Sequence, residues 1–390
     1  MPHILLEKHS DIVVGAKSDL KTSFDFIAKS KYDHKIGTTI EGKEFLLTKV
    51  DKNGNDLIKL DTATRLTPVR LMKDALNDYS SISNSKLLFS NTNSIHQRME
   101  PQQSYLKNID YFESEFETDK EILVEVGFGS GTHLLHQAVE NPDKLIIGLE
   151  IHTPSIEQVL KQLKLQNIEN VLVMNYDARL FLEFLKSNSV GRIFVHFPVP
   201  WDKKPHRRVM SVEFIKESLR VLKIDGTLEL RTDSPNYFEY SSGLLDSFKE
   251  YPSLIEKNKD LAVTSKYEAR WKRQEKDIWD VTITSTENST EDILEDDFSF
   301  VEISDIDSLK QRLLNVPTVK KDFLVHFVNV YTIDTDVKEG LLVKVTFGSF
   351  NRPVTKYIII QNNKARYFQG DPIKTKTNLM AHKVILENIN

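Results

Sequence analysis

The chain has 390 residues and a net charge of −5; 39% of its residues are hydrophobic and 28% are charged. This length suits two or three domains, and the composition is that of a globular protein rather than a disordered or membrane chain. The absence of cysteine excludes disulfides, thiolate metal ligands and cysteine nucleophiles. No apolar run approaches the roughly 18 residues of a membrane span, and no signal-peptide pattern opens the sequence. We therefore expect a cytoplasmic protein with neither a membrane nor a metal as a partner.

Residues 1–108 are predicted to form a β-rich N-terminal domain of unknown role. Two apolar runs flank the dipeptide Asn53-Gly54, which is typical of a β-hairpin turn. A helix is predicted from about residue 69. The segment from Ser80 to Ser104 is rich in Ser, Asn and Gln and is interpreted as a linker.

Residues 109–288 alternate short apolar runs with segments of helical periodicity. This rhythm predicts an α/β fold, an open and mostly parallel Rossmann-like sheet with helices on both faces. Five strands are expected, at Ile122–Val126, Lys144–Glu150, Val171–Met174, Arg192–Phe197 and Thr227–Arg231.

Residues 289–390 are predicted to be an acidic linker followed by a small α+β domain. The acids gather in Glu291–Asp297, and three β-like runs lie between His326 and Ile360. Short helices are expected before and after them. No residue pattern in this segment points to a function.

The most informative local pattern is a glycine loop after the first strand of the middle domain. The run Ile122–Val126 ends at Gly127, which is followed by Gly129, Gly131 and a helical segment. Glycines let the backbone pass close to a ligand, and the free N–H groups of a helix start favour polar or anionic groups. The loop therefore predicts a nucleotide-type site.

Three acids narrow the class of ligand. Gly131 follows Gly129 by two residues. In the dinucleotide fingerprint the third glycine follows the second by three residues. Glu125, two residues before the loop, suits the cationic amine of S-adenosylmethionine better than a pyrophosphate. Glu150 ends the second strand, where an acid accepts hydrogen bonds from ribose hydroxyls, and Asp177 follows the third, where it could receive an adenine amino group. The alternative is that each acid caps the helix after it.

A second informative stretch follows the fourth strand, from His196 to Arg208. Two prolines and Trp201 indicate a rigid loop, and Lys203 belongs to a dense cluster of four basic residues. Lys and Arg beside an aromatic ring suit contacts to nucleic-acid phosphates and bases. The alternative for such a cluster is a solvated charged face.

This stretch, Phe-Pro-Val-Pro-Trp-Asp-Lys-Lys-Pro-His-Arg-Arg, resembles the signature of the bacterial tRNA (guanine-N7)-methyltransferases, the TrmB family. The glycine loop is similar to the cofactor loop of that family. The resemblance covers about residues 110–285, and four further segments agree with it: Gly148–His152, Arg231–Asp233, Ser265–Arg270 and Asp277–Asp280.

The resemblance implies transfer of a methyl group from S-adenosylmethionine to N7 of a guanine in tRNA, guanine 46 of the variable loop. It implies that the cofactor is bound by Glu125, Gly127, Gly129, Glu150 and Asp177. It implies that the tRNA is bound by Lys203, Asp233, Ser265 and Glu268.

Two positions depart from the family pattern. Val199 stands where the family has an acid between two prolines. Ser265 stands where the closing segment of the family has a threonine. Guanine N7 carries an unprotonated lone pair, so no base is needed to expose it, and most of the rate can come from positioning. Our hypothesis is an active enzyme in which Asp233 or Asp202 partly fills the electrostatic role, with Glu268 as a further carboxylate able to offset charge.

Three alternatives stay open from the sequence. The first is a methyltransferase acting on another substrate, which the basic clusters disfavour. The second is a non-catalytic tRNA-binding protein, for which Val199 would be the mark of lost activity. The third is a nicotinamide dehydrogenase, disfavoured by the glycine spacing and Glu125. The sequence leaves the oligomeric state open.

Overall fold

The computed structural model describes residues 2–15, 21–66, 69–92, 104–260, 276–291, 293–303, 306–313, 317–335, 338–350 and 352–389. The chain divides into two compact units. One comprises Arg98–Leu294, and the other combines Met1–Gln97 with Glu295–Asn390. Among the helices of the described ranges, none is both long and apolar enough to cross a membrane.

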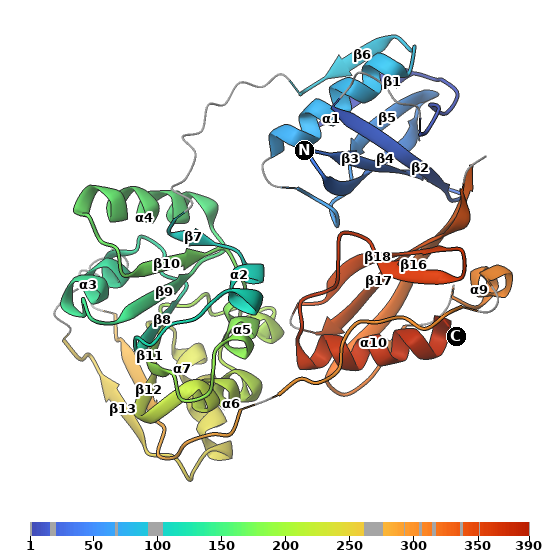
Figure 1. Ribbon diagram of the computed structural model, residues 1–390. Helices are drawn as coiled ribbons and strands as arrows, with labels where there is room; N and C mark the ends of the chain where they lie inside the picture. The colour runs from blue at the N-terminus through green and yellow to red at the C-terminus, as the bar shows by residue number, and fades with distance from the viewer. Residues whose placement is uncertain are drawn as a thin grey trace. The chain divides into compact units, whose positions relative to one another are not determined.

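The middle unit is built on an eight-stranded sheet in the order β13-β14-β12-β11-β8-β9-β10-β7 (Figure 1). The strands from β12 to β7 are all parallel, while β14 is antiparallel to both of its neighbours. The bounds are β7 (Leu106–Lys107), β8 (Ile122–Val126), β9 (Leu145–Leu149), β10 (Val171–Met174), β11 (Val190–His196), β12 (Leu222–Thr232), β13 (Ser253–Lys257) and β14 (Trp279–Thr284). The predicted parallel α/β sheet is confirmed. The antiparallel pair β13 and β14 was not predicted.

Helices join these strands, as the alternating pattern predicts. They are α2 (Ile109–Ser114), α3 (Thr132–Glu140), α4 (Thr153–Gln166), α5 (Ala178–Phe181), α6 (Val212–Val221) and α7 (Pro235–Leu244). Apolar side chains of α3 and α4 pack with those of β8, β9 and β10 in one core, in which Leu134 and Val159 are fully buried. Every residue of β8 is buried, as expected for a central parallel strand covered on both faces. The carboxyl ends of the parallel strands therefore form one edge, where the glycine loop lies.

The other unit contains an antiparallel sheet in the order β19-β18-β17-β16-β2-β3-β4-β5-β1-β6, with β15 paired to β16. Its strands are β1 (His3–Glu7), β2 (Thr22–Lys29), β3 (His34–Ile40), β4 (Lys43–Lys52), β5 (Asn55–Leu60), β6 (Leu87–Ser90), β15 (Thr318–Val319), β16 (Phe323–Thr335), β17 (Lys338–Ser349), β18 (Val354–Gln361) and β19 (Lys364–Tyr367). Its helices are α1 (Val69–Ile82), α9 (Ile306–Arg312) and α10 (Lys376–Ile389).

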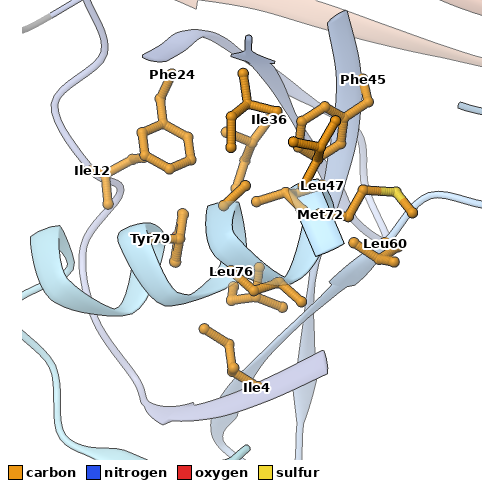
Figure 2. Packing of buried hydrophobic residues seen from close by; sticks show 14 of the residues in the cluster. Ile4, Ile12, Phe24, Ile36, Phe45, Leu47, Leu60, Met72, Leu76 and Tyr79 are labelled. Carbon is orange, nitrogen blue, oxygen red and sulfur yellow. The ribbon is translucent and has the colours of Figure 1, made fainter. Parts of the chain in front are cut away.

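Helix α1 covers one face of the N-terminal strands (Figure 2). Met72, Leu76 and Tyr79 of this helix are completely buried among strand residues such as Ile4 and Phe45. The strands β4 and β5 meet at Asn53 and Gly54, which both have positive φ. The linker predicted from Ser80 is wrong at its start, because α1 continues to Ile82 and β6 follows it.

The N- and C-terminal segments, expected as two separate domains, share this one sheet. Strand β2 pairs with β16 through Ala28 and Ile333. Behind this junction Lys35, with only 5% of its side chain exposed, donates a hydrogen bond to Asp61 at 3.0 Å, and Tyr357 donates one to the same carboxylate at 2.8 Å. The buried Lys35–Asp61 ion pair thus also binds Tyr357, which lies almost 300 positions after Asp61 in the sequence.

Candidate functional site

The glycine loop leaves open space at the carboxyl edge of the middle sheet. Gly127 and Gly129 have φ of +70° and +52°, values that favour glycine. A Cβ atom added at Gly127 would meet no atom within 4 Å. At Gly131 the requirement is steric, because a Cβ there would overlap the side chain of Val159 in α4. The loop therefore offers exposed backbone beside a closely packed helix pair.

Glu150 follows β9, and its carboxylate binds the main chain of the glycine loop. Its Oε2 accepts a hydrogen bond from the Gly129 N–H at 2.9 Å. Its Oε1 accepts from the N–H groups of Ile151 and His152 at 2.8 and 2.9 Å. The carboxylate therefore joins the glycine loop to the start of α4, with its partners all on the main chain.

Glu125 is the buried acid of β8, with 3% of its surface exposed. Its Oε2 lies 2.8 Å from Nδ1 of His133 in α3, and Gln137 contacts the other ring nitrogen of that histidine. The His133 ring also lies against His196 at the end of β11, with 4.5 Å between ring centroids. Sequence reasoning did not single out His133, although its place as the second residue of the helix after the loop is a usable signal.

Asp177 caps the short helix α5 by accepting a hydrogen bond from the Arg179 N–H. The guanidinium of Arg179 binds the same carboxylate at two points, Nε to Oδ1 at 3.0 Å and Nη2 to Oδ2 at 2.7 Å. Its third nitrogen, Nη1, donates to the carbonyl oxygen of His206 at 3.2 Å. The predicted helix cap is present, and it coexists with a fork-type ion pair.

The stretch after β11 forms a loop with two unusual backbone positions. Phe197 and Trp201 have φ of +50° and +46°, a region that costs free energy for large residues and clusters at functional sites. Arg208 is almost fully buried and donates through Nε to the Pro200 carbonyl at 2.7 Å. Its guanidinium also stacks on the Tyr240 ring, 4.4 Å from the centroid. We call Phe197–Arg208 the edge loop.

Charged side chains of the edge loop fall into two groups. Lys203, Lys204 and Arg207 are exposed, and Arg207 lies over the Trp201 ring at 5.1 Å. Asp202, half exposed, pairs with Arg208 at 3.3 Å. The exposed members present positive charge at the edge of the sheet.

Of the other residues that the sequence pointed to, Val199 and Asp233 lie within the described ranges. Val199 is 60% exposed. Asp233 follows β12 and pairs with Lys276 at 3.4 Å. Ser265 and Glu268 lie outside the described residues.

A cavity of about 200 Å³ opens between α3 and strands β11, β12 and β14. His133, His196, Arg192, Glu229 and Asp280 contribute to its lining. Burial lowers the pKa of the His196 imidazole well below 6.5, and His133, Arg231 and Arg192 act in the same direction. The His196 ring is therefore neutral at physiological pH. Within the described ranges, no group of three or more His, Asp or Glu side chains could hold a metal ion.

Comparisons with known proteins found a matching family, similar sequences and a similar solved structure. Residues 119–281 match a family described as "Putative methyltransferase". The chain is 41% identical to a tRNA (guanine-N(7)-)-methyltransferase of Wolinella succinogenes over 99% of both chains. It is 36% identical to one of Helicobacter hepaticus, again over 99% of both chains. A crystal structure of the 16S rRNA methyltransferase KamB is similar at 17% identity and a TM-score of 0.35, over 46% of this chain and 93% of that one.

The two relatives match the terminal segments as well as the middle unit, so the similarity extends beyond the stretch from about 110 to 285. Identity of this level over the full length of both chains establishes common descent. The chain belongs to the tRNA (guanine-N(7)-)-methyltransferase family.

Proposed function

We propose that this protein transfers a methyl group from S-adenosylmethionine to N7 of a guanine in tRNA. The observation that carries the proposal is the full-length similarity to relatives named for that reaction. The fold is compatible with it, because the glycine loop lies at the carboxyl ends of the parallel strands, where open α/β sheets bind their ligands. As a finer proposal, the target is guanine 46 of the variable loop.

The residues at the edge fit the cofactor. The open space beside Gly127 and Gly129 admits a ligand against the main chain, and the acids Glu125, Glu150 and Asp177 come from three successive strand ends. We assign Glu125 to the amine of the cofactor, Glu150 to the ribose hydroxyls and Asp177 to the adenine amino group. When bound, S-adenosylmethionine supplies an electrophilic methyl group on a sulfonium.

Each of these carboxylates already accepts protein hydrogen bonds, and this is compatible with binding. An ionised carboxylate has about four lone-pair sites. Glu150 uses three of them on backbone N–H groups, which fix its position and leave about one site for a ribose hydroxyl. The protein partners hold the acids in place before the cofactor arrives, which lowers the ordering cost of binding.

Transfer to N7 requires positioning more than proton removal. The N7 lone pair is unprotonated, so the exposed Val199 in place of the family acid removes no obligatory base. Holding the two reacting atoms in line can supply several kcal/mol of the barrier reduction, about 7 or more in favourable cases. We assign this task to the edge loop, whose backbone is fixed by Arg208.

The product base carries a positive charge, which a carboxylate can offset. Asp233 is a better candidate than Asp202, because its side chain is 22% exposed against 52%. A less exposed carboxylate is screened less by water. Both acids already have a cationic partner, Lys276 for Asp233 and Arg208 for Asp202, so the difference between them is exposure.

The exposed cations of the edge loop are assigned to tRNA phosphates, with Lys203 the one singled out by the family signature. Phosphate contacts fix the register of a nucleic acid and give binding its salt dependence. Ser265 and Glu268 are assigned to the region of the target guanine on the family resemblance alone. A cytoplasmic location stays a prediction.

The experiment is incubation of the purified protein with labelled S-adenosylmethionine and unmodified tRNA, followed by mapping of the methylated base. Label at N7 of guanine 46 is expected. Label on another nucleotide would refute the finer proposal, and no label with intact tRNA binding would favour a non-catalytic tRNA-binding protein.

The substitution Val199→Asp tests the role of the missing acid. We expect the parent to methylate tRNA and the variant to keep activity, because neither requires a base at this position. If the parent transferred no methyl group while Val199→Asp did, the hypothesis of an active parent would fail. Val212→Asp, on an exposed position of α6, controls for the added charge.

A further inference from the structure

Arg179 makes a connection that the proposed reaction does not itself require. Its guanidinium grips Asp177 with two nitrogens and the His206 carbonyl with the third. Asp177 is assigned to the cofactor, and His206 belongs to the edge loop assigned to tRNA. One rigid group thus spans the two binding regions, at the carboxyl end of β10 and in the loop that follows β11.

The geometry suits arginine and no other residue. The guanidinium is planar, always charged, and carries five N–H donors in a fixed fork. Both of its bonds to Asp177 are charge-assisted, and the side chain is only 12% exposed, so water competes weakly for it. A movement of Asp177 would therefore be transmitted to the carbonyl of His206, and a movement of the loop to Asp177.

We propose that Arg179 is a positioning residue that couples cofactor binding to tRNA binding. The inference rests on the proposed function, since it needs both ligands at this edge. A cofactor held at Asp177 fixes one end of the Arg179 bridge, and tRNA on the edge loop fixes the other. The second ligand to bind then meets a site that the first has already ordered, which gives positive coupling.

Coupling of this kind is reciprocal and measurable. If tRNA tightens cofactor binding by some factor, the cofactor must tighten tRNA binding by the same factor. Typical coupling factors lie at roughly 5- to 150-fold. We expect the parent to fall in this range, and removal of the Arg179 guanidinium to bring the factor close to one.

The test is calorimetric titration of S-adenosylhomocysteine into the full-length protein, with and without saturating unmodified tRNA. S-adenosylhomocysteine carries no transferable methyl group, so binding is measured without turnover. The variants are Arg179→Gln and the milder Arg179→Lys, which keeps the charge but lacks the planar fork that reaches both partners. The ratio of the two dissociation constants is the coupling factor.

Arg220 provides a matched control. Its side chain is 11% exposed, pairs with Glu217 and donates to the carbonyl oxygens of Leu182 and Leu185. This cluster contacts the segment leading into β11, away from the carboxyl edge. Arg220→Gln should lower stability as much as Arg179→Gln does and leave the coupling factor of the parent intact.

The possible outcomes separate the coupling from the reaction. A coupling factor near one in both Arg179 variants, with the parent value in Arg220→Gln, supports the proposal. A parent that methylates guanine N7 but binds the two ligands independently, or variants that keep the parent factor, would overturn the coupling and leave the function standing. A parent that neither binds S-adenosylhomocysteine nor methylates tRNA would overturn the function and the coupling with it.

Discussion

Replacement of Arg208 by methionine should disable the reaction without removing the cofactor site. The substitution keeps the length and apolar stem of the side chain and deletes the guanidinium. The variant loses three interactions of the guanidinium. These are the hydrogen bond to the Pro200 carbonyl at 2.7 Å, the contact with Asp202 and the stacking on Tyr240 at 4.4 Å. These three interactions fix the part of the edge loop that contains Val199.

The magnitude follows from these contacts. A hydrogen bond from a charged donor contributes about 1.5–3 kcal/mol, and a partly desolvated cation–π contact about 1–2 kcal/mol. A loss of about 2.8 kcal/mol, near the lower end of the sum, reduces the population of the observed loop conformation about 100-fold. We therefore expect kcat/KM for tRNA methylation to fall about 100-fold, with the fall mainly in kcat.

The assay is initial-rate methylation of unmodified tRNA, combined with titration of S-adenosylhomocysteine. The matched control is Arg207→Met in the same loop, because Arg207 is exposed and contacts only the face of Trp201 among the described partners. That control should raise KM for tRNA and weaken its salt dependence while keeping most of kcat. A folded Arg208→Met protein with the kcat of the parent would refute the reasoning.

Three further predictions concern other parts of the molecule. Glu150→Gln weakens the anchoring of the Gly129 N–H, and the dissociation constant of S-adenosylhomocysteine should rise roughly 10- to 100-fold by calorimetry. Because the folded state lowers the pKa of His196, the unfolded chain binds more protons, so stability falls as the pH drops below about 6.5. His196→Gln should reduce that slope in urea unfolding measured between pH 5 and 7.5. Asp61→Ala leaves Asp33 as the one carboxylate beside the buried ammonium of Lys35 and removes the acceptor of the Tyr357 hydroxyl, so it should destabilise its unit by about 1–3 kcal/mol, measured by denaturant unfolding.

Each of these predictions has a control of the same residue type. Glu140→Gln, exposed at the end of α3, should leave cofactor binding unchanged. His206→Gln, exposed in the edge loop, controls for the loss of an imidazole side chain as such. Asp51→Ala breaks an exposed pair with Lys8 and should destabilise the unit much less than Asp61→Ala does. Equal effects of a test variant and its control would contradict the corresponding prediction.

Local patterns in the sequence were sufficient for the framework of the site. The glycine loop, the acids after successive strands and the edge loop could each be found because strand, turn and helix signals are set by neighbouring residues. A parallel sheet then brings the carboxyl ends of its strands to one edge, so residues 125, 150 and 177 were expected to meet there. The strands β13 and β14 were missed because neither has the continuous apolar run of the buried parallel strands: β13 is largely exposed, and β14 buries only alternate residues.

Long-range contacts decided the rest. The sequence by itself determined a parallel α/β middle unit, its glycine loop and its membership of a family, since these depend on spacing and residue type. Only the tertiary structure showed that Arg179 bridges Asp177 and the edge loop, or that Lys35 joins the N-terminal strands to Tyr357 through Asp61. Such partners are chosen by packing, because a buried charge must be satisfied by whichever group the fold places beside it.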